Sequence, residues 1–247
     1  MAQRCVTVVL CITMVSLLLV GCGRSLTVIR GSGRVVTEER SVSGFDAISL
    51  RGVGELLIQQ TGVEGLSIEA EDNVMPLIVS RVEGGTLIIG FDRDNWTASI
   101  NLSQPVRFAL TVRDLRSIDL PGATNVTMDG LETSRLTVTL GGVGRIRLNE
   151  VSAQELVATL SGAGDLELSG QVASAEVNLN GLGAYRAGDL RTSDTRIDVN
   201  GAAGSTIWVT DRLDVTIAGA GSVSYYGNPT VSRRITGLGR VNPLGAR

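Results

Sequence analysis

Two residue types that most enzymes use, histidine and lysine, are missing from this chain of 247 residues. The sequence has no histidine, and all 22 of its basic residues are arginine. Without histidine the chain lacks the commonest general acid–base group and the commonest metal ligand. Without lysine it cannot form a Schiff base with a substrate. We therefore expect no cofactor, no metal and no enzymatic activity, and the net charge of −3 gives no reason to expect a nucleic acid partner.

Aromatic residues are also scarce, at 3% of the chain, whereas glycine occurs 31 times. With 43% hydrophobic residues there is enough apolar material for a sizeable core. That core must consist of valine, isoleucine and leucine, with many tight turns between segments. Such a composition favours β-structure over a helical bundle.

The first 22 residues have the features of a secretory signal. The apolar run from Val6 to Val20 is shorter than the roughly 20 residues of a membrane-spanning helix. The run ends in Leu19-Val20-Gly21-Cys22, which resembles the lipobox of bacterial lipoproteins. That resemblance implies cleavage between Gly21 and Cys22, with a diacylglycerol on the Cys22 thiol. An uncleaved anchor and an ordinary secretory signal are the alternatives.

The remaining cysteines fit a lipoprotein. Cys5 and Cys11 would leave with the signal, so only Cys22 would remain and no internal disulfide is possible. Residue 23 is glycine. In a bacterium with two membranes, a lipoprotein with this neighbour resembles those sent to the outer membrane.

A short glycine motif recurs through the rest of the chain. It consists of an apolar residue, one spacer, Gly-x-Gly and an alternating run. From Gly122 the first glycines follow at steps of 20, 20, 19, 20, 18 and 18 residues. The glycines expected at corners are Gly52, Gly54, Gly122, Gly142, Gly144, Gly162, Gly164, Gly181, Gly183, Gly201, Gly204, Gly219, Gly221, Gly237 and Gly239. A period near 20 predicts stacked repeats that share one core.

The segments around the glycines alternate between apolar and polar residues, as in Leu136, Val138 and Leu140. This period of two predicts strands with one buried face. Parallel β-solenoid rungs and antiparallel hairpins both fit it. Hairpin tips favour Asn-Gly or Asp-Gly, whereas valine, alanine or leucine separates these glycines. We therefore expect an all-β parallel solenoid, with those apolar residues pointing inward at the corners.

The chain divides into regions of different regularity. We expect a signal peptide over 1–21, a tether over 22–30, a solenoid domain over 31–242 and a tail over 243–247. Within the solenoid, 31–120 is less regular than 121–242. The spacing between Gly52 and Gly122 does not fit the repeat, and 72–81, which contains Pro76, predicts a connection or short helical turn.

Three stretches, in this order, are similar to a known family. They are 30–56, with Gly52-Val53-Gly54; 66–89, with Leu66-Ser-Ile68-Glu-Ala-Glu-Asp-Asn73; and 226–239, with Tyr226-Gly-Asn-Pro229. Together with the repeats they resemble the putative auto-transporter adhesin, head GIN domain family. The resemblance implies a β-helix-like bacterial envelope protein and supplies no functional residues.

Three groups of side chains are candidate sites. Asp92 and Asp94 are reminiscent of a calcium loop but lack its glycine and distal glutamate. Asp165, Glu167 and Asp189 are candidate carboxylates for glycoside hydrolysis, but no column of acids forms after the corners. The aromatic residues Trp96, Tyr185, Trp208, Tyr225 and Tyr226 would stack on sugar rings if they shared one exposed face.

These observations leave three hypotheses about function. We expect a lipid-anchored envelope module that binds a protein or glycan. The alternatives are a carbohydrate-active enzyme that uses aspartates, and a structural protein that assembles through its ends.

Overall fold

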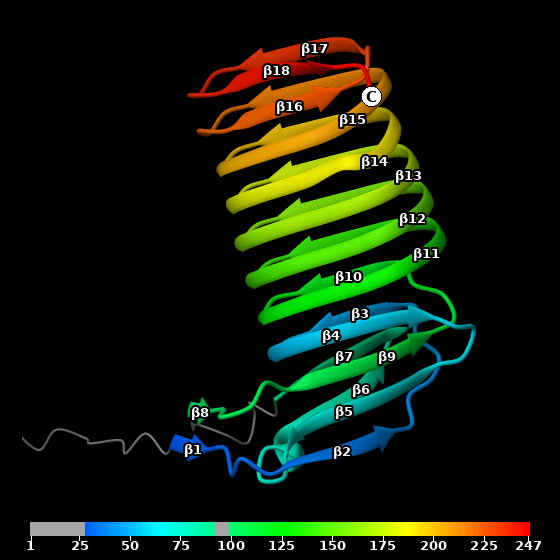
Figure 1. Cartoon of the computed structure of the whole chain (residues 1–247), viewed down its shortest axis with the longest axis vertical. Helices are drawn as coiled ribbons and strands as arrows, with labels where there is room; N and C mark the ends of the chain where they lie inside the picture. The colour runs from blue at the N-terminus through cyan, green and yellow to red at the C-terminus, as the bar shows by residue number, and fades with distance from the viewer. Residues whose placement is uncertain (1–27, 92–98) are drawn as a thin grey trace, which may run out of the picture.

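The computed structural model describes residues 28–91 and 99–247, which form a tall stack of strands (Figure 1). The stack begins with short strands of the less regular region. These are β1 (Val28–Arg30), β2 (Val35–Arg40), β3 (Ala47–Leu50), β4 (Val53–Gln60), β5 (Gly65–Glu71), β6 (Ile78–Glu83), β7 (Thr86–Phe91), β8 (Ser99–Asn101), β9 (Arg107–Val112) and β10 (Ser117–Leu120). The long strands that follow are β11 (Ala123–Leu140), β12 (Val143–Leu160), β13 (Ala163–Leu179), β14 (Leu182–Val199) and β15 (Ala202–Ile217). The stack ends with β16 (Ser222–Tyr226), β17 (Thr230–Ile235) and β18 (Arg240–Gly245).

The repeats form a parallel β-solenoid, as the sequence predicts. Each long strand from β11 to β15 is one rung that bends around the core, and each pairs in parallel with the next. The register follows the repeat, because Leu136 lies opposite Leu156 and Leu140 opposite Leu160. Since the pairing is parallel, the antiparallel hairpin alternative is wrong.

In-register stacking places like residues above one another. One inward column consists of Leu50, Leu120, Leu140, Leu160, Leu179, Val199 and Ile217, all fully buried. Burial of one such side chain stabilises the fold by about 1.5–3 kcal/mol. Because a single rung cannot cover its own apolar face, the stack gains this stability only collectively.

The first glycine of each motif allows the rungs to stack closely. A Cβ on Gly162 would lie 1.8 Å from the carbonyl oxygen of Gly142, its counterpart one rung earlier. The second glycines also meet backbone, and Gly183 has a φ of +139° besides. Glycine is therefore required at these positions by both space and conformation.

Gly204 is an exception to the predicted corner set. Ala203 lies opposite Gly183 and takes the place of the second glycine, whereas Gly204 lies opposite Ala184. A Cβ on Gly204 would meet only the Ser222 hydroxyl, at 3.8 Å. Gly204 is therefore not a corner glycine, because the corner of this rung consists of Gly201, Ala202 and Ala203.

The residue between the two glycines points outward, which corrects the expectation that it points inward. Val143 is 59% exposed, Leu182 60% and Leu238 87%. The corner turns through the glycines themselves, so the side chain between them faces solvent. The solenoid prediction is confirmed, although this part of its reasoning was wrong.

The less regular region includes a rung that comes out of sequence order. The β3–β4 rung pairs with β10 and β11 above it, although 70 residues separate Gly52 from Gly122. The chain between them descends through β5 and β6, and then β7 and β9 pair in parallel beneath β3 and β4. Three pairs in this region are antiparallel: β5 with β9, β6 with β7, and β2 with β5. The predicted helical turn is a 3-10 turn at Met75–Leu77.

Two predicted boundaries differ from the structure. β1 lies within the expected tether and pairs with β8, and β18 runs past residue 242 into the expected tail. β18 extends because it continues the ladder of β16.

The two ends of the stack carry features that oppose further strand pairing. At the C-terminal end, Arg233 lies opposite Val215 in an inward column of the core, and Pro243 interrupts β18. At the other end, β2 presents the exposed charged residues Glu38 and Glu39. Inward charges, proline and charged edge strands oppose the pairing of a sheet edge with another strand.

Candidate functional site

The candidate carboxylates Asp165 and Glu167 lie on the outer face of β13 within a network of arginines. Arg186 Nη1 is 2.9 Å from Asp165 Oδ2 and 3.2 Å from Glu167 Oε1. On the other side, Arg147 Nη2 is 2.8 Å from Glu167 Oε2, and Arg145 contacts both carboxylates. The side chains thus alternate in charge from rung to rung.

This network is unsuited to acid catalysis. Partial burial alone would raise the pKa of Asp165, but hydrogen bonds and attraction from Arg186 and Arg145 outweigh it and lower that pKa. A general acid of a glycosidase needs a raised pKa. Asp189 is not their neighbour, since it lies opposite Ser169 and forms an ion pair with Arg247.

The other predicted chemistry falls partly outside the structure. Residues 92–95 of the calcium-like loop, and Cys22 with Gly21, lie outside the described residues. In the part of the chain that is described, no group of three or more acidic, cysteine or histidine side chains could hold a metal ion. Within the same residues, no helix has the length and hydrophobicity of a membrane span.

A step forms where the rungs become shorter. β14 has 18 residues and β15 has 16. Ala187 pairs with Ile207 and Arg191 pairs with Trp208, so residues 188–190 have no partner in the next rung. This corner of β14 therefore projects beyond the shorter rungs that follow.

The aromatic side chains gather beside this step. Trp208 of β15 lies between the buried residues Ile207 and Val209, which places it on the outer face, and Tyr226 lies opposite it on β16. The guanidinium of Arg247 lies over both rings, 5.6 Å from the centre of the Trp208 ring and 5.2 Å from that of Tyr226. Arg247 is held by the Gly188 carbonyl and the Asp189 carboxylate. We call Trp208, Tyr226, Arg247 and residues 188–189 the aromatic notch.

Two of the other predicted aromatics are not part of this surface. Tyr185 is buried in the core, where desolvation raises its pKa. Tyr225 lies opposite Ile207 in an inward column and packs against the core. Trp96 lies outside the described residues. Of the four predicted aromatic residues that the structure describes, Trp208 and Tyr226 therefore share one face.

Two shallow hollows flank Arg247 in the notch. One, of about 390 Å³, is lined by Arg191, Trp208, Thr210, Gly227, Asn228, Ala246 and Arg247. The other, of about 510 Å³, includes Arg186, Asp189, Thr206, Ser224 and Tyr226 in its lining. Aromatic rings beside hydroxyl, amide and charged groups are suited to binding a polar ring-shaped ligand.

Backbone contacts hold the notch in place. Thr192 Oγ1 donates a hydrogen bond to the Trp208 carbonyl oxygen at 2.9 Å. Gly227 turns the chain beside Trp208 with a φ of +99°, and its amide donates to the Gly245 carbonyl oxygen at 2.9 Å. The backbone that carries Trp208 and the turn that follows Tyr226 are thus held by contacts within the fold.

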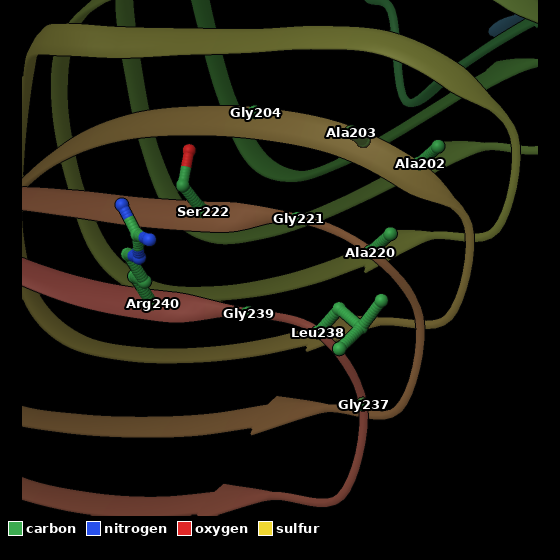
Figure 2. A pocket seen from close by; sticks show the side chains of 10 residues that line it. All are labelled: Ala202, Ala203, Gly204, Ala220, Gly221, Ser222, Gly237, Leu238, Gly239 and Arg240. Atoms are coloured by element: carbon green, nitrogen blue, oxygen red, sulfur yellow. The ribbon is translucent and has the colours of Figure 1, made fainter.

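The residues at the position between the paired glycines form a second, mostly exposed surface, a column along the solenoid. Its members are Val53, Ala123, Val143, Ala163, Leu182, Ala202, Ala220 and Leu238. Figure 2 shows the last three on successive rungs, beside Gly204, Ser222 and Arg240 of the next column. The hollow there, of about 640 Å³, has Arg240 as its one charged lining residue. The column is one side chain wide and brings few polar groups together.

Sequence reasoning missed the step and the role of Arg247. The shortening of the repeat from 20 to 18 residues after Gly201 was a visible sign of the step. No sequence signal connects Arg247 with residues 188–189, because nearly 60 residues separate them.

Solved structures with the same fold come from bacterial proteins. A putative adhesin from Bacteroides fragilis is 27% identical, with a TM-score of 0.82, covering 87% of this chain and 100% of that one. A putative lipid binding protein from Parabacteroides distasonis is 22% identical, with a TM-score of 0.70, covering 88% and 100%. A putative adhesin from Parabacteroides merdae is 20% identical, with a TM-score of 0.63, covering 88% and 99%. The last two similarities concern the fold alone.

No curated protein matches the sequence. A family model, by contrast, matches residues 44–229, somewhat less than the 30–242 over which the sequence shows its resemblance. That match covers the β3–β4 rung, the inserted strands and the regular repeats through β16. The chain therefore belongs to the putative auto-transporter adhesin, head GIN domain family.

Proposed function

We propose that this chain is a lipid-anchored binding module of the bacterial cell envelope, and that its ligand binds at the aromatic notch. The family is one of putative adhesins, which fits a binding module. The lipobox supports the anchor, and the aromatic pair Trp208 and Tyr226 supports the binding site.

The lipobox at Leu19–Cys22 supports the anchor. A diacylglycerol contributes two chains, and two lipid chains are enough for stable membrane attachment. In a bacterium with two membranes, Gly23 favours the outer membrane. The solenoid would then be a rigid body carried on a short tether at the membrane surface.

The observation that carries the proposed binding site is the position of Trp208 and Tyr226. In a chain with 3% aromatic residues, two of them lie opposite each other on the outer face, beside the step in the rungs. Aromatic side chains are enriched among the residues that dominate binding energy. The rings also adjoin two hollows with polar linings.

Neither alternative hypothesis has comparable support. The enzyme hypothesis requires a free carboxylic acid, whereas Asp165 and Glu167 are paired with arginines. The end-to-end hypothesis requires open strand edges, whereas Arg233 and Pro243 interrupt the C-terminal one.

Two measurements test the proposal. The intact mass of the protein from native-type membranes, compared with Cys22→Ala, tests the anchor. A chain that begins at Cys22 and carries a diacylglycerol-sized increase, absent in the variant, is expected. An unmodified chain would contradict the anchor.

For the notch, the detergent-solubilised full chain is tested against a panel of immobilised polysaccharides and envelope proteins. We expect Trp208→Ala together with Tyr226→Ala to weaken binding by roughly tenfold or more. Leu182→Ala is the matched control, because it also removes an exposed apolar side chain, but from the column of residues between paired glycines. Equal binding by all three proteins would contradict a role for the notch.

A further inference from the structure

We propose that the hollow between Arg191 and Arg247 binds a carboxylate-bearing sugar ring, with Arg191 as the group that pairs with the carboxylate. This inference rests on the proposed function and specifies its ligand class. It concerns one of the two hollows, the one lined by Trp208, Thr210 and Asn228 as well as both arginines.

Arg191 differs from Arg186 and Arg247, the other arginines that line the two hollows, because its side chain has no partner in the described structure. Arg186 is paired with Asp165 and Glu167, and Arg247 with Asp189. The Arg191 side chain is exposed and, within the residues that the structure describes, forms no hydrogen bond or ion pair. Its guanidinium is therefore available for two parallel hydrogen bonds to one carboxylate.

The position of Arg191 directs that charge into the hollow. It is the first residue after the unpaired segment 188–190 to rejoin the ladder, and it lies opposite Trp208. A ligand ring beside the Trp208 side chain would therefore lie next to the Arg191 guanidinium. Thr210 and Asn228 place a hydroxyl and an amide in the same lining, where sugar hydroxyls would find partners.

The charge of the lining also favours an anion. The charged residues that line this hollow are Arg191 and Arg247, and its lining contains no aspartate or glutamate. Asp189, which pairs with Arg247, lines the other hollow. Positive charge on two sides of one hollow raises the local concentration of ligands with the opposite charge.

A neutral sugar would use only part of this arrangement. It would contact the Trp208 ring, Thr210 and Asn228 but leave Arg191 without a partner. A hydrogen bond to a charged group contributes about 1.5–3 kcal/mol, which corresponds to at least roughly tenfold in affinity. The expected signature is thus a preference for the acidic form of a sugar over its neutral form.

The test compares oligogalacturonate with its methyl ester, which has the same sugar backbone but carries an uncharged methyl ester in place of each carboxylate. Binding of each to the detergent-solubilised full chain is measured by calorimetry. The wild type is expected to bind the acidic probe roughly tenfold more tightly. That preference should shrink between about 50 mM and about 500 mM salt.

The variants assign the preference to a residue. Arg191→Gln should remove the preference without changing affinity for the methyl ester. Arg234→Gln is the matched control, because Arg234 is also exposed and unpaired in the described structure but lies on β17, outside both hollows of the notch. Thermal unfolding followed by circular dichroism verifies that each variant is folded.

Several outcomes would overturn the inference. They are equal affinity of the wild type for the two probes, no binding of either, or an equal loss in Arg191→Gln and Arg234→Gln. If Trp208→Ala weakens both probes equally while Arg191→Gln changes nothing, the notch remains a binding site and only the assignment of an acidic sugar is wrong.

Discussion

The hydroxyl of Thr192 donates a hydrogen bond to the carbonyl oxygen of Trp208, at 2.9 Å, across the boundary at which the rungs shorten. The same hydroxyl lies 2.7 Å from that of Thr195, and both threonines are buried. Since Thr192 has one proton and gives it to Trp208, Thr195 must be the donor to Thr192. A short chain of hydrogen bonds thus connects the interior of β14 to the backbone of the aromatic notch.

The first prediction concerns Thr192→Val, which keeps the shape of the side chain but removes its hydroxyl. The Trp208 carbonyl loses this donor and the Thr195 hydroxyl loses its acceptor. We expect the free energy of unfolding to fall by about 1–3 kcal/mol, as measured by urea denaturation. Thr139→Val is the control, because Thr139 lies on the outer face and its hydroxyl forms no hydrogen bond within the described residues. Equal losses in the two variants would show that the hydrogen-bond chain contributes nothing specific.

The second prediction compares two glycines that the sequence presents as equivalent. Gly162→Ala would place a Cβ 1.8 Å from the Gly142 carbonyl oxygen, so the rungs would have to separate. We expect a loss of about 3 kcal/mol or more in the free energy of unfolding. Gly204→Ala, with only the Ser222 hydroxyl nearby, should change it by less than about 1 kcal/mol. Similar urea midpoints for the two variants would contradict the assignment of Gly204.

The contrast between these glycines shows how far the sequence defines the fold. A repeat of nearly constant length lets each buried residue lie above its counterpart in the previous rung, and it therefore predicts parallel rungs. The structure confirms this prediction in β11–β15. Motif matching could not distinguish Gly204 from a corner glycine, because only the register against β14 places Ala203 at the corner. It also misjudged Val143, since the direction of a side chain at a glycine turn depends on backbone angles that the pattern does not contain.

The inserted strands and the notch depend on contacts between distant residues. The β3–β4 rung pairs with β10 and β11, but the strands β5–β9, which include the rung beneath it, lie between them in the sequence. The spacing of Gly52 and Gly122 therefore does not match the repeat length. Similarly, the sequence indicates that Trp208 and Tyr226 belong to neighbouring rungs, but not that Arg247 returns to cover them.

The third prediction concerns the pH dependence of the arginine network. The pKa of Asp165 is lowered in the folded state, so its ionised form is stabilised relative to the unfolded chain. This contribution is present above the unfolded pKa, near 3.8, and is lost as the pH falls through the lower folded value. Asp165→Asn should therefore be less stable than the wild type at pH 7, and the difference should shrink below about pH 4. Urea midpoints at several pH values measure it.

Asp194→Asn is the control for this pH series. Asp194 is exposed and forms no ion pair in the described part of the chain. Its substitution should leave the difference from the wild type nearly constant with pH. A parallel pH profile for Asp165→Asn would mean that the arginine pairs do not stabilise the fold, as is common for exposed ion pairs.

The last prediction concerns the protected C-terminal edge. Arg233 occupies an inward column above Val215, and Pro243 removes a backbone donor from β18. Replacing both with valine would continue the apolar column and restore a pairing edge, so we expect concentration-dependent association in sedimentation velocity. Arg234→Val, on the outer face of the same strand, controls for the added hydrophobicity and should stay closer to the wild-type profile. If the double variant sediments like the wild type, these residues do not limit the length of the stack, and protection of the edge must come from elsewhere in the last rung.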